Sequence, residues 1–245
     1  MSRTIAIIPA RSGSKSILDK NLVDLGGYPL IAYSIAAAKL SRGVDRVIVS
    51  TDSSSYAEIA THYGAEVPFL RPAELSSDTS TDLDFMLHAM HWLEKYDQDE
   101  PEYWVHLRPT TPLREPTLID NALLALKNEP QATALRSGHL SPESPFKWLR
   151  KNSDGFLVGL TSDDTDLDKY NLPRQAYPDV YIPDGYVDVV KRSFVMTANK
   201  LHGDRVLAFE SPYCTEVDSI EELELLSFQI SKVDSPLTEY LRGIN

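Results

Sequence analysis

The sequence predicts an α/β fold built on a doubly wound, mostly parallel sheet. Through the first half of the chain, short apolar runs alternate with longer helical patterns, as in strands joined by crossover helices. The apolar runs lack polar alternation, so both faces of the strands are expected to be covered. With 245 residues, 42% of them hydrophobic, the chain can bury the core of one such domain.

The predicted elements follow from residue type and spacing. Thr4–Pro9 is β-branched and apolar, which predicts a buried strand, and the alanine-rich Leu30–Leu40 predicts a helix. Further strands are expected at Arg46–Ser50, near Val67, and at Tyr103–Leu107, Val187–Val190 and Val206–Phe209. Further helices are expected at Ser55–Tyr63, Asp82–Tyr96, Thr117–Leu126 and Glu221–Ser231, the last with Asp218 and Ser219 as candidate caps.

The alternation of strands and helices breaks after about Ala132. Residues 141–183 carry several prolines and aromatic side chains, and Lys147–Leu149 with Phe156–Leu160 flank a turn sequence that predicts a β-hairpin. We therefore expect one domain over residues 1–245, in which 141–183 is a small β-rich insertion that mediates dimerisation.

Composition excludes several classes of protein. The net charge of −12 argues against binding to nucleic acid, because such proteins present a basic face to phosphate. The apolar run at Ile5–Pro9 is too short for a signal sequence, and no stretch is long enough to span a membrane. The single cysteine, Cys214, excludes a disulfide framework. We expect a cytoplasmic protein.

The loop after the first strand has the composition of a phosphate-binding loop. It runs from Pro9 to Asn21 and carries Arg11, Lys15 and Lys20 among glycine and serine. Arginine offers a planar fork and lysine a point charge to phosphate oxygens, while small residues expose backbone N–H groups. In a doubly wound sheet such a loop lies at the ligand-binding edge, so it is expected to hold a triphosphate. It matches neither the Walker loop nor the dinucleotide fingerprint.

Six blocks in order resemble the CMP-sugar synthetase family, which includes the acylneuraminate, legionaminate and pseudaminate cytidylyltransferases. The blocks are IPARSGSKSILDKN at 8–21, VIVSTDS at 47–53, RPAELSSDTSTD at 71–82, LRPTTPLR at 107–114, RQAYPDVYIPDGYVDV at 174–189 and EVDSIEEL at 216–223. The resemblance covers nearly the whole chain and implies a Rossmann-like nucleotidyltransferase fold.

The resemblance implies a CTP site. Arg11 and Lys20 would contact the phosphates and act, with Asp218, as catalytic residues; Arg71 would contact cytidine, and Ser80 or Thr81 would lie near the base. The other implied nucleotide-binding residues are Ala10, Ser14, Lys15 and Asn21.

The family carries an Asp-x-Asp pair for Mg²⁺, and this chain has Glu216-Val217-Asp218 in its place. In an extended segment the two carboxylates lie on one face, about 7 Å apart, so both can reach one ion. Asp218 is therefore expected to bind Mg²⁺, with Glu216 as a second ligand. The other reading of Asp218 is a cap for the helix that follows.

Seven candidates for the sugar site follow from the resemblance: Arg108, Thr110, Thr111, Lys147, Arg174, Gln175 and Asp184. Arg108 stands where the family often has Gln, Asp184 stands where Asn is usual before Gly, and the opening loop lacks the usual Gly and Pro around Lys15. These departures leave the identity of the sugar open. The 141–183 insertion would pack against a twin chain, so that Lys147 and Arg174 complete the partner's sugar pocket.

The implied reaction is CMP transfer from CTP, with Mg²⁺, to the anomeric hydroxyl of an acidic nonulosonic (sialic-acid-like) sugar, releasing pyrophosphate. The alternatives are another nucleotide, a 3-deoxy-octulosonate-type sugar, or a nucleotide-binding relative without turnover. Homodimerisation is expected, with no nucleic-acid or membrane partner. The residues do not single out a general base for the sugar hydroxyl.

Overall fold

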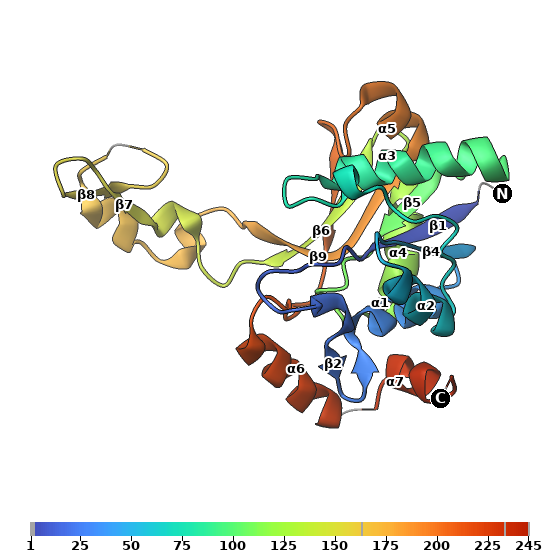
Figure 1. Cartoon of the computed structure of the whole chain (residues 1–245). Helices are drawn as coiled ribbons and strands as arrows, with labels where there is room; N and C mark the ends of the chain where they lie inside the picture. Colours follow the sequence, from blue (N-terminus) through green and yellow to red (C-terminus); the bar gives the residue numbers. More distant parts are fainter. Residues whose placement is uncertain (1–2, 163, 233, 245) are drawn as a thin grey trace.

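A six-stranded sheet in the order β10-β6-β9-β5-β1-β4 organises the computed structural model, which describes residues 3–162, 164–232 and 234–244 (Figure 1). Its strands are β1 (Thr4–Pro9), β4 (Arg46–Ser50), β5 (Tyr103–His106), β6 (Ala134–Leu140), β9 (Tyr181–Lys191) and β10 (Val206–Glu210). Strand β9 is antiparallel to β5 and β6, and the other neighbours pair in parallel. The expected doubly wound, mostly parallel sheet is therefore confirmed.

Helices cover both faces of this sheet, and successive side chains of β1 point to opposite faces. Ala6 and Ile8 of β1 pack in one core cluster with residues of α1, α2, α4, α6 and α7, and Ile5 and Ile7 pack in a second with residues of α3 and α5. The helices are α1 (Leu30–Leu40), α2 (Ser54–His62), α3 (Asp82–Trp92), α4 (Pro116–Asn128), α5 (Arg192–Ala198), α6 (Ile220–Lys232) and α7 (Pro236–Arg242).

Shorter elements shape the loops. Two small hairpins pair β2 (Asp24–Leu25) with β3 (Tyr28–Pro29), and β7 (Leu149–Lys151) with β8 (Leu157–Gly159). In the described part of the chain, 3₁₀ turns lie at Lys20–Leu22, Ala73–Leu75, Pro145–Lys147, Leu167–Asn171 and Arg174–Ala176, and a π-helical turn at Leu93–Asp97 extends α3. The second hairpin is the one that the sequence predicts in the insertion, with its first strand two residues later than expected.

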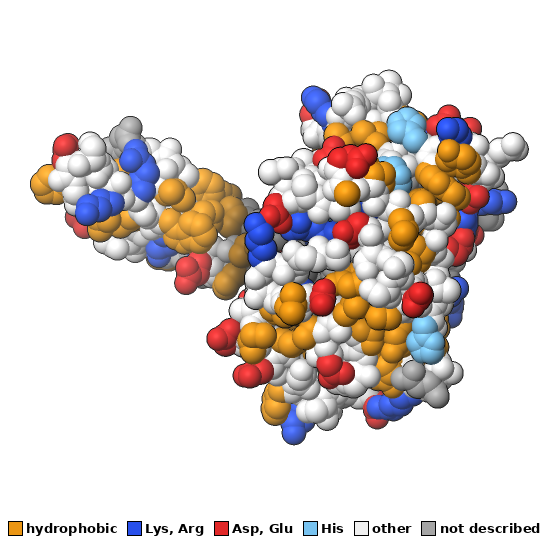
Figure 2. Space-filling view, in the orientation of Figure 1, with side chains coloured by type: hydrophobic (Ala, Val, Ile, Leu, Met, Phe, Trp, Pro, Cys, Tyr) orange, Lys and Arg blue, Asp and Glu red, His pale blue; other side chains and the backbone are white. Residues whose placement is uncertain are grey.

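The segment between β6 and β9 projects from the body as an arm (Figure 1). The arm corresponds to the expected insertion at 141–183, of which residue 163 lies outside the described residues. Pairing of β6 with β9 continues to the base of the arm, where Leu140 faces Tyr181, after a register shift between Arg136 and Gly138. Figure 2 shows hydrophobic side chains gathered on the arm. Its exposed large side chains are Trp148, Leu149, Phe156, Leu157, Leu160, Leu172, Tyr181 and Ile182.

Several elements differ from the sequence prediction. Near Val67 the chain makes isolated bridges, Ile48 with Glu66 and Thr51 with Leu70, in place of a strand. Strand β6 was not predicted, because Arg136 and Gly138 interrupt its apolar run. Helices α5 and α7 were also missed, although Pro236 at the first turn of α7 and its cap Ser235 are a recognisable helix start. Within the described residues, no helix is both long and apolar enough to cross a membrane.

Candidate active site

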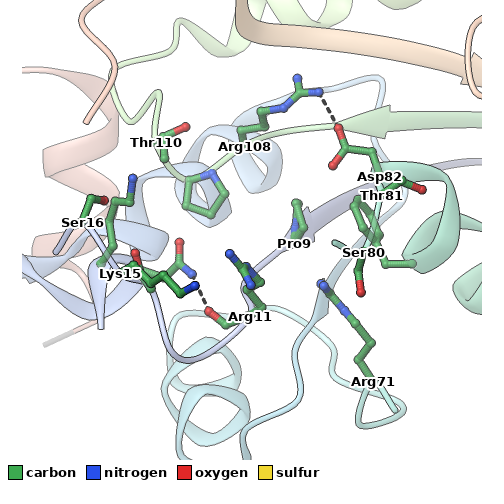
Figure 3. A pocket seen from close by; sticks show the side chains of 15 residues that line it. Pro9, Arg11, Lys15, Ser16, Arg71, Ser80, Thr81, Asp82, Arg108 and Thr110 are labelled. Carbon is green, nitrogen blue, oxygen red and sulfur yellow. Dashed lines mark hydrogen bonds and ion pairs between the residues drawn. The ribbon is translucent and has the colours of Figure 1, made fainter. Parts of the chain in front are cut away.

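A cavity of about 460 Å³ lies beyond the C-terminal ends of β1 and β5 (Figure 3). The loop after β1 forms one wall, the segment leading into α3 a second, and the loop after β5 a third. Eight of the predicted nucleotide-binding residues line it: Arg11, Ser14, Lys15, Lys20, Asn21, Arg71, Ser80 and Thr81. The ninth, Ala10, is buried behind the wall, and its N–H donates to the Ser50 carbonyl.

Hydrogen bonds between side chains and the backbone hold the loop after β1 in shape. Gly13 has φ +71°, a left-handed conformation that favours glycine. The Ser12 N–H and hydroxyl each donate to the Asp52 carboxylate at 2.8 Å, and Asn21 donates to the Arg11 carbonyl at 3.1 Å. Burial raises the pKa of Asp52, but the bonds from Ser12 outweigh it and lower the pKa, so this anchor is ionised. The cationic side chains of the loop are thereby presented to the cavity.

Asp78 binds two of these cations. The Arg11 guanidinium donates to Asp78 at 2.8 Å, and the Lys15 ammonium pairs with the other oxygen of the same carboxylate. Hydrogen bonds from Lys15 and Arg11 lower the pKa of Asp78. One anion therefore bridges two side chains at the end of the cavity where phosphate is expected.

Lys20 joins this wall to the C-terminal part of the chain. Its ammonium donates to the Val217 carbonyl at 3.1 Å and to the Asp218 carboxylate at 2.8 Å. The Val217 N–H in turn donates to the Thr110 carbonyl at 2.8 Å, in the loop after β5. Because of these bonds, three segments distant in sequence converge at one corner of the site.

Glu216 and Asp218 lie at this corner as a pair of carboxylates. Burial and the neighbouring charge of Asp218 raise the pKa of Glu216. The helix cap is Ser219, because the Glu222 carboxylate accepts from the N–H groups of Asp218 and Ser219 at 2.8 Å while the Ser219 hydroxyl accepts from the Glu222 N–H. The Asp218 carboxylate is thus not needed as a cap and is 68% exposed.

These two carboxylates suit a divalent cation that has few protein ligands. Among the described residues, no cluster of three or more His, Cys, Asp or Glu side chains could enclose a metal. Mg²⁺ commonly binds one or two carboxylates and takes its remaining ligands from water and substrate phosphate. The donor set therefore fits Mg²⁺ carried by a polyphosphate, and the repulsion that raises the pKa of Glu216 would be relieved by such an ion.

Arg71 forms the opposite end of the cavity. It is 5% exposed; its Nε donates to the Ser50 hydroxyl at 3.0 Å, its Nη2 donates to the Ser50 carbonyl, and its guanidinium lies 4.9 Å from the centre of the Phe85 ring. Burial lowers the pKa of Arg71 to about 10, so the group stays charged at neutral pH. Figure 3 shows Arg71 and Ser80 at the end of the cavity remote from Lys15 and Ser16. Phe85 on α3, which sequence reasoning missed, packs against this guanidinium, and the bonds to Ser50 help to orient it.

Arg108, the residue at the usual Gln position, is bound by two carboxylates. Its Nη2 donates to Asp82 at 2.7 Å, and its Nη1 donates to Asp188 on β9 at 3.0 Å. Asp82 lines the cavity and belongs to the block at 71–82, where only the helix start was recognised; Asp188 carried no sequence signal of a role. His106 is buried beside this group, and neither of its ring nitrogens has a partner among the described residues.

The sugar candidates on the body of the protein, besides Arg108, are Thr110, Thr111 and Asp184. Thr110 lines the cavity. Thr111 is buried and donates to the Asp184 carbonyl at 3.0 Å. The Asp184 carboxylate accepts from Ser137 at 2.8 Å, from the Tyr186 N–H at 3.0 Å and from Ser211, so it fixes the start of β9 to β6 and to the end of β10. Thr111 and Asp184 thus lie behind the cavity wall.

Lys147, Arg174 and Gln175 lie on the arm. Lys147 donates to the Leu172 carbonyl at 3.0 Å, and Arg174 donates to the Ser141 carbonyl at 2.8 Å. Both bonds close the arm on itself, and none of the three residues lines the cavity of its own chain.

Residues 5–155 match the family model described as cytidylyltransferase. The chain belongs to the cytidylyltransferase family. It is 33% identical over 226 residues to the N-acylneuraminate cytidylyltransferase of Escherichia coli, covering 91% of this chain and 51% of that protein. It is 40% identical over 121 residues to the CMP-N,N'-diacetyllegionaminic acid synthase of Legionella pneumophila, covering 49% of this chain and 52% of the relative. The aligned region thus spans about half the length of each of these relatives.

Among solved structures, this cytidylyltransferase fold is similar to that of a CMP:2-keto-3-deoxy-manno-octonic acid synthetase complexed with CTP. The TM-score is 0.69 at 18% identity, with 94% of this chain and 99% of the other covered. At this identity the likeness shows the Rossmann-like nucleotidyltransferase fold alone.

Proposed function

We propose that this chain transfers CMP from CTP to the anomeric hydroxyl of an acidic nonulosonic, sialic-acid-like sugar and releases pyrophosphate. The observation that carries the proposal is the arrangement of cations along the cavity. Arg11, Lys15 and Lys20 lie at one end, and Arg71, stacked on Phe85, lies at the other. A nucleoside triphosphate has the matching distribution of charge, with its phosphates at one end and a base with hydrogen-bond acceptors at the other.

The reaction is an in-line displacement at the α-phosphorus of CTP. The anomeric oxygen forms a bond to phosphorus, the bond from phosphorus to the oxygen bridging the α- and β-phosphates breaks, and that oxygen leaves with pyrophosphate and the bonding electrons. The proton of the sugar hydroxyl is released. Arg11, Lys15 and Lys20 bind the phosphates and stabilise the charge that develops on the leaving group, and Arg71 fixes the base.

Glu216 and Asp218 are the residues that would hold Mg²⁺. When bound, the ion would neutralise phosphate charge and favour departure of pyrophosphate. The support is the carboxylate pair itself, since the charge of Asp218 raises the pKa of Glu216 and Asp218 is not used as a helix cap.

The sugar is proposed from the names of the relatives together with the cavity. An acidic sugar needs cationic or hydroxyl partners, and Arg108 and Thr110 of the cavity wall supply them. Lys147, Arg174 and Gln175 would reach the substrate from the arm of a second chain in a homodimer. The exposed apolar side chains of the arm support this association, because contiguous apolar surface marks protein interfaces. Residues 141–183 would thus be both dimerisation and sugar-site subdomain of one cytidylyltransferase domain.

The alternatives are an octulosonate-type sugar, a different nucleotide and a relative without turnover. A panel of CTP, UTP, ATP and GTP with Mg²⁺, each combined with N-acetylneuraminate, legionaminate, pseudaminate and 3-deoxy-octulosonate, separates them by pyrophosphate release. Release only with CTP and a nonulosonic acid supports the proposal. Preference for the octulosonate or for another nucleotide would reassign the substrate. No pyrophosphate release with any pair would favour a nucleotide-binding relative without turnover. CTP belongs to the cytoplasmic pool, so we place the activity in the cytoplasm.

A further inference from the structure

Two carboxylates bind the same guanidinium on the cavity wall, and they differ sharply in burial. Arg108 donates through Nη2 to Asp82 at 2.7 Å and through Nη1 to Asp188 at 3.0 Å (Figure 3 shows the bond to Asp82). The Asp82 side chain is 41% exposed, whereas that of Asp188 is 1% exposed. A shared partner and unequal access to water suggest different tasks.

Asp188 is fixed in place by the sheet. It lies in β9, opposite His106 of β5 on one side and Arg136 of β6 on the other. Burial raises the pKa of Asp188, but contacts with His202 and Arg108 outweigh it and hold the pKa far below its usual range, so the group is ionised at neutral pH. Because its side chain is buried, water cannot take the place of the Asp188 carboxylate at Nη1 of Arg108. Asp188 therefore holds this edge of the guanidinium in one position.

Asp82 can exchange its partner. It is the first residue of α3, where the helix dipole stabilises a negative charge, and its side chain forms part of the cavity wall. A partly exposed ion pair contributes at most about 1 kcal/mol to stability, so an incoming anion can displace it at small cost.

The charge balance gives the two carboxylates opposite effects on an acidic ligand. The guanidiniums of Arg108 and of Arg136, whose Nε lies 4.0 Å from Asp188, face two carboxylates, so the group has no net positive charge to attract a further anion while Asp82 is bound to Arg108. We propose that Asp188 is a positioning residue that fixes Arg108, and that Asp82 occupies the edge of Arg108 that the sugar carboxylate takes on binding. This inference rests on the proposed function, and it names the residues that set the affinity of the site for an acidic sugar.

The test compares Asp82→Asn, Asp188→Asn and the matched control Asp99→Asn. Asp99 also pairs with an arginine, Arg46, at 2.9 Å. The Asp99 side chain is 11% exposed and lies outside the cavity. Steady-state KM values for the acid and for CTP are measured, with unfolding temperatures for all proteins. We expect Asp82→Asn to lower the KM for the acid by about threefold or more, and Asp188→Asn to raise it by about tenfold, with the KM for CTP unchanged in both. Asp99→Asn leaves both KM values unchanged.

Asp82→Asn decides the matter even if Asp188→Asn fails to fold, because Asp82 is partly exposed. A KM for the acid that is unchanged or raised in Asp82→Asn overturns the proposal, and so does a parallel loss of kcat without a KM change in both variants. If the wild-type chain turns over no acid at all, the proposed function fails, and calorimetric binding of N-acetylneuraminate to the same proteins then tests the inference. Affinity in the order Asp82→Asn, wild type, Asp188→Asn supports it; equal affinities or no binding overturn it.

Discussion

The Lys20 ammonium donates to the Asp218 carboxylate at 2.8 Å, between residues 198 positions apart in the sequence. One is the cation expected to bind phosphate, and the other is the carboxylate expected to bind Mg²⁺. Each neutralises the charge of the other. A triphosphate carrying Mg²⁺ would supply a new partner for both at once, so binding of the complex would exchange one ion pair for two.

Lys20→Ala is expected to reduce CMP transfer by roughly a hundredfold or more, because a charge on the leaving phosphates is lost. Folding should be preserved, since the pair with the 68% exposed Asp218 contributes up to about 1 kcal/mol. Turnover by pyrophosphate release and the unfolding temperature check both points. Lys39→Ala, a change of the lysine in the last turn of α1, is the control. Near-normal turnover of Lys20→Ala would remove Lys20 from the phosphate site.

Asp218→Asn is expected to raise the Mg²⁺ concentration for half-maximal activity by about tenfold, because a neutral amide is a weaker ligand for a hard cation. Glu216→Gln should shift it less if Asp218 is the principal ligand. Mg²⁺ titrations at saturating CTP measure the shift, with Glu221→Gln in the first turn of α6 as the control. An unchanged Mg²⁺ dependence in both carboxylate variants would place the metal elsewhere.

Arg71→Lys is expected to raise the KM for CTP by about tenfold. The Nε and Nη2 of Arg71 hold Ser50 while the same planar group rests on Phe85, and an ammonium cannot make both contacts and reach the base. The KM for CTP should rise, whereas the KM for the acid should stay at its wild-type value. Arg205→Lys, which alters a surface contact with Gln131, controls for the change of residue type. Equal KM values for CTP in the variant and the wild type would contradict the base-binding role.

The position of the basic loop at the cavity could be predicted because it depends on local sequence. A strand that enters a loop of small and basic residues places that loop at the ligand-binding edge of the sheet, and Arg11, Lys15 and Lys20 all lie there. The closeness of Glu216 and Asp218 could be predicted for a similar reason, because an extended segment places alternate side chains on one face, and the charge of Asp218 adds to burial in raising the pKa of Glu216. Their role as Mg²⁺ ligands stays a prediction.

The partners of Arg108 could not be predicted, because they depend on the pairing of distant strands. Asp188 lies 80 residues from Arg108 and reaches it because β9 runs antiparallel beside β5. Asp184 shows the converse. Its place in a family block suggested the sugar, whereas the start of β9 directs its carboxylate inward to Ser137 and Ser211. Side-chain direction at this point depends on the irregular pairing of β6 with β9, which has no sequence signal of its own.

His106→Phe is expected to reduce the acid sensitivity of the fold. Burial lowers the pKa of His106 to about 4, below the value near 6.5 of an unfolded histidine, so the unfolded chain takes up a proton first as pH falls. The difference in proton uptake at His106 does not affect the free energy of unfolding above about pH 6.5. Between pH 6.5 and 4 it lowers that free energy progressively. The free energy of unfolding should therefore fall by about 2 kcal/mol less between pH 7.5 and pH 5 in the variant than in the wild type.

At pH 7.5 the His106→Phe variant should be at least as stable as the wild type, because the two ring nitrogens have no partner among the described residues. Urea denaturation at both pH values measures the difference. His91→Gln, a change of a histidine with a 64% exposed side chain, is the control. An identical pH dependence of wild type and His106→Phe would show that His106 titrates normally in the folded chain.

Phe156→Asp combined with Leu160→Asp is expected to disrupt the proposed homodimer, because it places charge on the exposed apolar surface of the arm. Light scattering should show twice the 27.4 kDa chain mass for the wild type and the single mass for the variant. Turnover should fall while CTP binding persists, since the cavity lies in the body. Leu124→Asp, at an exposed position of α4, is the control. A monomeric wild type with full activity would disprove the role of the arm.

The most direct test of the proposed reaction is incubation of the wild-type chain with CTP, Mg²⁺ and N-acetylneuraminate, legionaminate or pseudaminate, followed by mass spectrometry and pyrophosphate measurement. We expect at least one acid to give a CMP-linked sugar and pyrophosphate in equal amounts, and UTP to give neither. CTP binding without product for every acid, or product with UTP at the same rate as with CTP, would contradict the proposed function.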